Sequence, residues 1–279
     1  MIDSFSSKDV DVIKEILETN NIKKLNIICW THPHEDHSIG IDTLIDTYSD
    51  KNTEVWIPEN IITDDRKVSK SSRLLFEKLK KEISKKTSIY TVCSASDKKD
   101  MLYRHNIGNV IHNHNSYEIN MYTLAPKSQT MLTEEFLNKY IANEESIVFY
   151  LTVGNAYYLF AGDAEDVSLR NIPSKEIPEH IHFLKIPHHG SKSSKLLIDM
   201  IVNGSDISSS TVYRIGSSNL PDHDVLSLYS NKSDNLFCTS KSSDENSGDY
   251  GVIHCRTDIL KEEYEWETLG NAYRVSKFV

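Results

Sequence analysis

The chain has 279 residues, of which 38% are hydrophobic and 26% charged, and its 31 basic and 41 acidic residues give a formal net charge of −10. This length suits one large domain or two small ones, and the sparse glycine and proline (10 and 7 residues) argue against a low-complexity or disordered chain. The acidic balance argues against a protein that coats nucleic acid with its whole surface, although a local basic patch or a bound metal can still attract phosphate.

Apolar periodicity in the first half of the chain predicts helices and strands in alternation. A helix is expected over residues 8–22 and a short strand over 25–30, and helical spacing resumes at 39–45 after a polar loop. The other elements expected here are strands at Glu54–Ile57, 88–92, 110–111 and 117–124 and helices at 72–85 and 131–142.

The second half repeats this style, beginning with a hairpin of strands 147–153 and 156–161 around the turn Gly154-Asn155. Residues 204–210 and 240–248 are polar and are expected to be loops. The remaining expected elements are strands at 182–186, 211–215, 236–239, 251–256 and 263–268, a helix at 193–202 and a short helix from about 224.

Two sheets packed face to face, with helices on both outer faces, accommodate this order of elements. We therefore expect a single α/β domain spanning residues 1–279, built as a four-layer αββα sandwich.

Cysteine usage and the apolar runs give expectations about the compartment. No segment approaches the ~18 apolar residues of a membrane span, and the first residues lack the pattern of a secretory signal. The four cysteines lie far apart and form no CxxC pair. We expect a cytoplasmic protein with free thiols and no membrane contact.

Three histidines and two carboxylates lie within residues 32–37 (HPHEDH), directly after an apolar strand. Burial of so polar a segment costs free energy unless its side chains have partners. Neutral imidazole and carboxylate are good ligands for zinc and related divalent ions. In an extended segment His32 and His34 project the same way and can hold one ion. Asp36 and His37, at the turn into the next helix, can face a second ion beside it.

Later segments add candidate ligands at or beyond strand ends. Asp163 follows an apolar strand in AGDAE; a carboxylate there can bridge two cations, although such an aspartate usually caps the next helix. The paired His188 and His189 end another strand, and Gly190 lets the backbone pass close to a site. His223, in PDHD, follows a loop, and a lone histidine is more often incidental.

These motifs together resemble the metallo-β-lactamase-fold hydrolase superfamily. More narrowly, they are similar to the branch that holds the hydrolase domain of ComEC-type DNA-uptake proteins and the phosphorylcholine esterase-type members. Residues 25–40 resemble that branch's strand-THPHxDH-xxG segment, residues 143–165 its N-x-x-S-hairpin-GDAE segment, and residues 184–194 (LKIPHHGSKSS) its LKxxHHGSxxS signature. The resemblance is good over about 22–50 and 143–225 and thin elsewhere.

The resemblance implies two metal sites whose ligands are spread over four segments. The first site would take His32, His34 and one of the paired histidines, and the second Asp36, His37 and His223, with Asp163 bridging.

The same resemblance suggests catalytic and substrate-binding residues. We favour His189 as the ligand and His188 as a catalytic neighbour that orients substrate or relays protons; the reverse assignment stays open. Asp36 is expected to be essential for catalysis, and Ser191 and Lys192 are candidates for substrate binding.

Two features depart from the family pattern. Members usually begin with a β-hairpin leading into an I-D-x-G segment, of which residues 1–4 resemble only the end, with Phe5 where the glycine would be. One sheet is therefore expected to have an exposed edge, or to be completed by a protein partner or a second copy. The last histidine lies in LPDHDV rather than Y-G-H-P, which weakens the assignment of His223 most.

The implied activity is hydrolysis by a hydroxide held between two divalent ions, Zn²⁺ first and Mn²⁺ second. Two such ions against Asp36 and Asp163 leave a positive pocket, which selects an anionic substrate. We expect a phosphodiesterase or nuclease, with DNA or RNA as substrate by family analogy. The alternatives are hydrolysis of a small ester, lactone, thioester or amide, and a metal-stabilised interaction module of a multi-protein assembly. A redox di-iron role is disfavoured because family members of that kind carry Glu where His34 stands.

Overall fold

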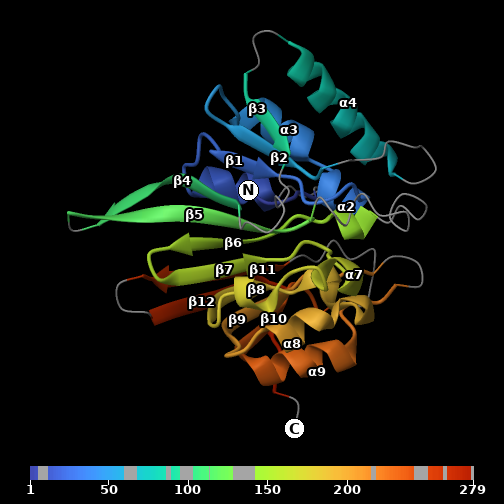
Figure 1. The fold of residues 1–279 in the computed structure, drawn as a ribbon, viewed down its shortest axis with the longest axis vertical. Coiled ribbons are helices and arrows are strands. Elements are labelled where there is room, and N and C mark those ends of the chain that lie inside the picture. Colours follow the sequence, from blue (N-terminus) through green and yellow to red (C-terminus); the bar gives the residue numbers. More distant parts are fainter. Residues whose placement is uncertain are drawn as a thin grey trace. The chain divides into compact units, whose positions relative to one another are not determined.

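The computed structural model confirms a mixed α/β chain (Figure 1). It describes residues 1–5, 12–59, 68–85, 89–94, 103–112, 114–127, 142–214, 218–241, 251–259 and 263–277. The chain forms two units: Met1–Lys99 with Pro126–Ile147, and Asp100–Ala125 with Val148–Val279. A single domain over residues 1–279, with its sheets face to face, stays a prediction.

The first unit is built on a three-stranded parallel sheet in the order β1-β2-β3. The strands are β1 (Ile27–Cys29), β2 (Glu54–Ile57) and β3 (Thr91–Ser94). The helices are α1 (Val12–Thr19), α2 (Glu35–Ser38), α3 (Ile41–Tyr48) and α4 (Lys70–Ser84), with a 3₁₀ turn, η1, at Ala142–Glu145. Apolar residues of α1, α3 and α4 share one buried core with β1 and β2.

Residues 1–3 lie beside β1 and use backbone groups along that edge of the strand. The Cys29 amide donates to the Met1 carbonyl over 2.8 Å, and the Asp3 amide donates to the Cys29 carbonyl over 2.8 Å. Ile2 forms a parallel bridge with Cys29. The chain's own first residues therefore pair with β1, where the sequence predicted an exposed edge or a protein partner.

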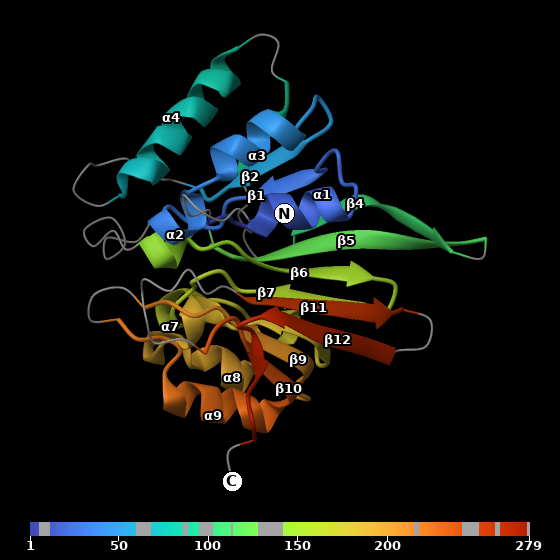
Figure 2. The same cartoon turned by 180° about the vertical axis from the view of Figure 1, so that it is seen from behind.

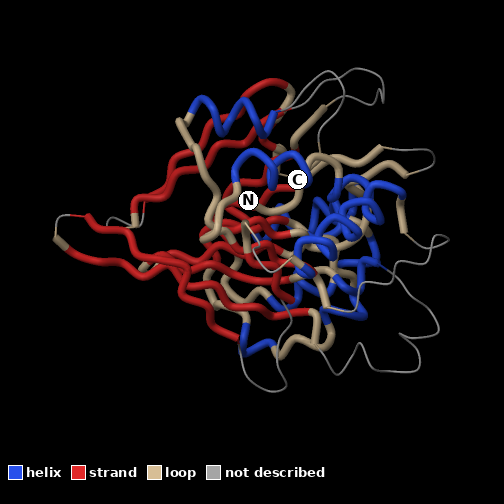
Figure 3. Tube along the Cα trace, turned by 90° about the horizontal axis from the view of Figure 1, so that it is seen from above, coloured by secondary structure: helices blue, strands red, loops and turns tan. Residues whose placement is uncertain are grey.

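The second unit contains an eight-stranded sheet in the order β13-β10-β9-β8-β7-β6-β5-β4. Strands β7 to β10 are mutually parallel, so their carboxyl ends lie along one edge of the sheet. The strands are β4 (Tyr103–His112), β5 (Asn115–Ala125), β6 (Val148–Val153), β7 (Ala156–Phe160), β8 (Ile181–Lys185), β9 (Ser205–Ser210), β10 (Ser233–Cys238) and β13 (Tyr273–Arg274). Strands β4 and β5 form a long hairpin that reaches past its neighbours (Figure 3).

Helices cover one face of this sheet, and a separate hairpin covers the other (Figure 2). The helices α7 (Asp166–Leu169), α8 (Leu196–Met200) and α9 (His223–Lys232) share a core with the strands through Leu169, Leu197 and Val225. On the opposite face, β11 (Gly251–Asp258) and β12 (Glu263–Gly270) pack on β10, where the Phe237 and Trp266 ring centroids are 4.8 Å apart.

One region contradicts the sequence-based assignment. Residues 204–210 were expected to be a loop and 211–215 a strand, but β9 occupies Ser205–Ser210 and all six of its residues are buried. The physical reason is a hydroxyl cluster: the Ser208 Oγ lies 2.7 Å from the Ser205 Oγ and 2.6 Å from the Ser233 Oγ of β10. Because the hydroxyls satisfy one another, a serine-rich strand can be buried at little cost.

Other expected elements are confirmed with shifted bounds. The helix expected at 72–85 is α4, whereas the one expected at 193–202 is divided into a 3₁₀ turn at Lys192–Ser194 and the short α8. Residues 8–11 and 131–141 of two expected helices lie outside the described residues. All four cysteines are free, as expected. None of the described helices is long and apolar enough to cross a membrane.

Candidate metal centre

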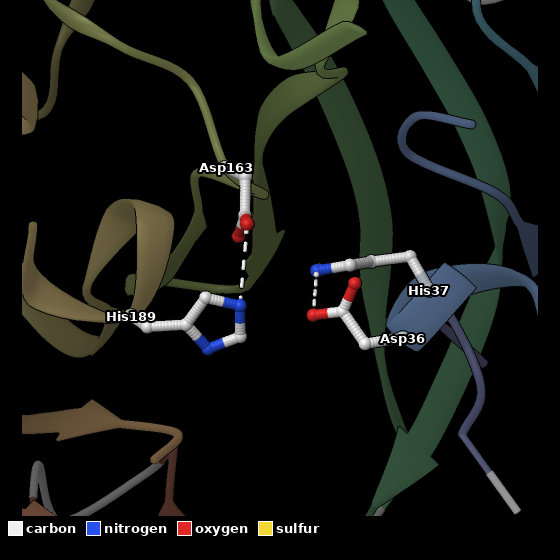
Figure 4. Close-up of side chains that lie close together, drawn as sticks. All are labelled: Asp36, His37, Asp163 and His189. Atoms are coloured by element: carbon white, nitrogen blue, oxygen red, sulfur yellow. Dashed lines mark ion pairs between the residues drawn. The ribbon is translucent and has the colours of Figure 1, made fainter. Parts of the chain in front are cut away.

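The first unit presents four potential ligands between β1 and the end of α2. The His32 ring is fully buried and its centroid lies 4.8 Å from that of His34 and 4.1 Å from that of His37. Because α2 begins at Glu35, Asp36 and His37 lie on its first turn, with the His37 Nε2 and an Asp36 carboxylate oxygen 3.4 Å apart (Figure 4). Two imidazoles and a carboxylate thus converge with a third imidazole beside them.

A single carboxylate, that of Asp3, fixes the orientation of two of these rings. One Asp3 oxygen accepts a hydrogen bond from the Thr31 amide (2.7 Å), and the other accepts one from the Thr31 hydroxyl (2.6 Å) and lies 2.7 Å from the His37 Nδ1. The Thr31 Oγ1 also lies 3.0 Å from the His32 Nδ1. An ionised carboxylate only accepts, so the His37 Nδ1 carries the proton of its bond to Asp3. The Thr31 hydroxyl donates its one proton to Asp3, so the His32 Nδ1 in turn donates to the Thr31 oxygen. In the neutral rings the Nε2 atoms of His32 and His37 then carry no proton, which is the state that a metal requires.

Hydrogen bonds of the Ser38 hydroxyl fix the short helix α2 to its neighbours. The Trp30 indole donates to the Ser38 Oγ over 3.1 Å, and that oxygen lies 2.7 Å from the Ser72 Oγ of α4. The Ser38 hydroxyl also donates to the His34 carbonyl. These contacts hold both ends of the ligand segment against the core of the first unit.

The second unit presents Asp163 and His189 at the carboxyl ends of β7 and β8. Both are buried, with 2% and 6% of their surface exposed. The His189 Nε2 lies 3.2 Å from an Asp163 oxygen (Figure 4), and its Nδ1 lies 2.8 Å from the Thr211 Oγ1. The His189 ring therefore contacts the Thr211 hydroxyl through its Nδ1 and the Asp163 carboxylate through its Nε2.

The backbone after β8 adopts an unusual conformation to place this ring. His188, His189 and Gly190 have successive φ angles of +42°, +52° and +77°. Left-handed backbone costs a non-glycine residue roughly 1–2 kcal/mol, and such strain often accompanies functional sites. At Gly190 a side chain would also collide, because its Cβ would lie 2.9 Å from the Pro221 Cβ.

The neighbouring His188 has different partners. Its Nδ1 lies 3.1 Å from a Glu165 carboxylate oxygen and 3.1 Å from the Ser193 Oγ. In the second unit, His189 rather than His188 therefore faces Asp163, which supports the favoured assignment of the ligand.

The remaining predicted residues of the second unit do not join this pair. The His223 side chain is 78% exposed, and its Nδ1 lies 4.0 Å from Asp224. Lys192 forms ion pairs with Asp222 (3.2 Å) and Asp224 (3.5 Å), and the Ser191 hydroxyl accepts a hydrogen bond from the Ser193 amide. The roles of His223 as a ligand and of Ser191 and Lys192 in substrate binding stay predictions.

Another group of possible ligands lies near the amino ends of β8 and β9. His180, His182 and Asp206 have ligand atoms within 4.8 Å of one another. However, the Tyr157 amide donates to the His182 Nδ1 over 3.1 Å, so the proton of the neutral ring is on Nε2. Neither nitrogen of His182 is then ready to bind a cation, and His180 instead pairs with Asp206 over 3.1 Å.

The donor sets at the two ligand groups fit divalent cations. The group of the first unit combines three imidazoles with the Asp36 carboxylate, and that of the second unit combines the His189 imidazole with the Asp163 carboxylate; these are the ligand types of zinc and of related ions. In each group hydroxyls or carboxylates contact the Nδ1 of ligand histidines, as is usual around bound metals. Sequence reasoning assigned no role to the partners Asp3, Thr31 and Thr211: the first two lie in segments that resemble the family's I-D-x-G and THPHxDH patterns, whereas Thr211 lies in no such motif.

Thr211 offers a specific test of this arrangement. The Thr211→Val variant keeps the shape of the side chain but cannot pair with the His189 Nδ1, so we expect metal affinity to fall by about 10- to 100-fold. Thr211→Ser retains the hydroxyl and should stay near the parent value. Competition with a chromogenic chelator measures both, and equal affinity for the Val and Ser variants would contradict the prediction.

No family model matches the sequence, and no curated protein matches it. Three solved structures are similar to part of the chain. CmlA, a diiron beta-hydroxylase from Streptomyces venezuelae, is 12% identical with a TM-score of 0.35, and the match covers 70% of this chain and 26% of CmlA. A CmlA mutant is 13% identical with a TM-score of 0.35, and that match covers 70% of this chain and 27% of the mutant. A diphosphatase from the PhnP family is 14% identical with a TM-score of 0.33, covering 70% of this chain and 64% of the diphosphatase. This chain thus spans about a quarter of the length of CmlA, and similarity at this level assigns no activity to it.

Proposed function

We propose that this protein is a metal-dependent hydrolase of phosphodiesters, with the two ligand groups together binding two divalent ions. The observation that carries the proposal is the preset state of the ligand rings, because the Asp3 network leaves the Nε2 atoms of His32 and His37 ready to bind. A histidine-rich surface loop without a metal role has no need of a partly buried carboxylate that orients two rings.

The ligands follow the motifs that resemble the metallo-β-lactamase superfamily. In this proposal one ion takes His32, His34 and His189, the other takes Asp36 and His37, and Asp163 is shared. His223 is left out because its side chain is largely exposed. Zn²⁺ suits this mixture of nitrogen and oxygen donors best, with Mn²⁺ second.

Bound divalent ions would supply Lewis acidity, which lowers the pKa of water and neutralises charge on phosphoryl oxygens. The chain's own residues do the positioning. Thr211 and Asp3 hold the ligand rings, and the Glu165 carboxylate orients His188 by its Nδ1. The His188 Nε2 would then take a proton from the attacking water and pass it to the leaving oxygen.

The substrate class follows from charge. Two bound divalent ions would outweigh the carboxylates of Asp36 and Asp163 and would make the metal centre locally positive on an acidic protein. A phosphodiester monoanion matches this field, whereas a neutral ester or lactam gains nothing from it before reaction.

The test combines metal analysis with a panel of substrates. After loading with Zn²⁺ or Mn²⁺ and gel filtration, elemental analysis should give about two ions per chain. Turnover of bis-p-nitrophenyl phosphate, DNA and RNA is compared with that of a chromogenic β-lactam and simple esters. Phosphodiester turnover that EDTA abolishes and metal restores is the expected result.

Two outcomes would overturn the proposal. Turnover of carbonyl substrates alone would make the protein an ester, lactone or amide hydrolase. Two tightly bound ions without turnover of any substrate would make it a metal-stabilised interaction module.

A further inference from the structure

Aromatic and cationic side chains line the carboxyl edge of the parallel strands β8 to β10, beside the ligand His189. We propose that Tyr213, Arg214 and Lys241 form a binding track for single-stranded nucleic acid. The proposal rests on the proposed phosphodiesterase function and names its substrate: a chain with unpaired bases next to the phosphodiester that is cleaved. Ligands of α/β sheets bind at this edge, outside the carboxyl ends of the strands.

Tyr213 connects the track to the ligand group. Its ring stacks on the His189 ring, with centroids 5.1 Å apart and an interplanar angle of 30°. Its backbone is fixed by two hydrogen bonds with Leu220, of 3.1 and 2.9 Å, and its side chain is only partly buried. A fixed aromatic ring touching a metal ligand is suited to stack on a base that flanks the reacting phosphate.

The cations lie one and two strands further along the edge. Arg214 donates through its Nε to the Asn219 side chain over 3.2 Å. Lys241, which follows β10 and is exposed, has its Nζ 5.3 Å from the centroid of the Tyr273 ring. Burial raises the pKa of Tyr273 to about 12, and the charge of Arg214 acts against that rise, which places the guanidinium near this tyrosine.

These cations differ from Lys192 in what surrounds them. Lys192 is paired with Asp222 and Asp224, so its charge is balanced. Within the described part of the chain, neither Arg214 nor Lys241 forms an ion pair with a carboxylate. Among the described residues, Arg214 contacts the Asn219 amide and Lys241 the Tyr273 ring, contacts that leave their charges unbalanced. From β8 to β10 the track extends over about 10 Å.

A stacking ring followed by two cations favours a single strand over other phosphodiesters. Stacking needs an unpaired base, and it tolerates any sequence because every base has a π face. A duplex hides its bases, and a lipid phosphodiester has none. The structure therefore predicts a preference for single strands over duplexes and over chains that lack bases.

The test measures binding directly, in EDTA so that no turnover occurs. Fluorescence anisotropy with a labelled oligothymidylate, an abasic chain of equal length and a duplex gives the three affinities. Wild-type protein should bind the oligothymidylate most tightly. Tyr213→Ala should weaken that affinity by about 5- to 150-fold and leave the abasic chain almost unaffected, whereas Tyr213→Phe should retain the preference.

The cations are tested by the salt dependence of the same binding. Each phosphate contact contributes about 0.7 to the slope of log K against log salt for a single strand. Arg214→Gln and Lys241→Gln should each reduce the slope by about that amount. Lys277→Gln is the matched control, because Lys277 is an exposed lysine far from the carboxyl edge of the sheet. It follows β13, whose neighbouring Val275 amide donates to the Leu236 carbonyl of β10, and it lies toward the amino end of β10. The salt dependence of binding should be the same in this variant as in the parent.

The outcomes separate this inference from the proposed function. Equal affinities for the oligothymidylate and the abasic chain, or unchanged affinity in Tyr213→Ala, would overturn the track even if bis-p-nitrophenyl phosphate is hydrolysed. Base-dependent binding without hydrolysis of any phosphodiester would support the track and overturn the proposed function. Circular dichroism of each variant excludes misfolding as the cause of a loss.

Discussion

The His189→Ala variant is expected to lose at least about a thousandfold of its phosphodiesterase turnover and to retain fewer metal ions than the parent. Its ring is held by the Thr211 hydroxyl and directed at Asp163, and alanine removes that nitrogen altogether. The Asp163 carboxylate, 2% exposed, would then lack its imidazole neighbour. Elemental analysis and initial rates with bis-p-nitrophenyl phosphate measure both effects.

His188→Ala is the matched control, because the two histidines are adjacent and have similar backbone conformations. Its ring contacts Glu165 and Ser193 rather than Asp163. We expect the variant to keep its full metal content and to lose about a hundredfold or more in turnover, the usual effect of removing a general acid. If His188→Ala loses metal while His189→Ala retains it, the assignment of the two histidines is reversed.

Most of the candidate ligands could be proposed from the sequence because they lie in short segments with a distinctive composition. The HPHEDH segment places four candidate ligands within six residues, so the three rings and the Asp36 carboxylate lie close together along the chain and in the structure. Asp163 and His189 each follow an apolar strand, and parallel pairing of β7 with β8 brings the strand ends together. Local sequence and strand order together account for both groups.

The parts that could not be predicted depend on contacts between distant residues. The serine-rich sequence of the buried strand β9 predicts a loop, because the residue that forms a hydrogen bond with the Ser208 hydroxyl is Ser233, 25 residues away. The place of His223 in the fold is also not written in its motif: it begins helix α9 with Asp222 as the N-cap, and its role as a ligand stays a prediction. The role of Asp3 is equally hidden, since Thr31 and His37 are 28 and 34 residues away.

Asp3→Asn is expected to lower metal affinity by about 10- to 100-fold with little loss of stability. The asparagine oxygen can still accept from the Thr31 amide, so the shape of the network is kept. Its amide nitrogen, however, only donates, and it replaces the oxygen that contacts both the Thr31 hydroxyl and the His37 Nδ1. The His37 proton is therefore driven from Nδ1 to Nε2, the atom needed for metal binding.

Asp3→Ala separates this tautomer effect from a general loss of structure. Alanine leaves three donors without their acceptor, and each buried group costs about 1–3 kcal/mol, so thermal unfolding should shift clearly downward. The Asn variant should unfold near the parent temperature but bind metal weakly, as measured by competition with a chelator. Two-dimensional NMR of the imidazole nitrogens gives the tautomer directly: an Nε2-protonated His37 in Asp3→Asn and an Nδ1-protonated ring in the parent. If both proteins have the same tautomer, Asp3 supports the fold alone and the preset state of the ligand rings has another cause.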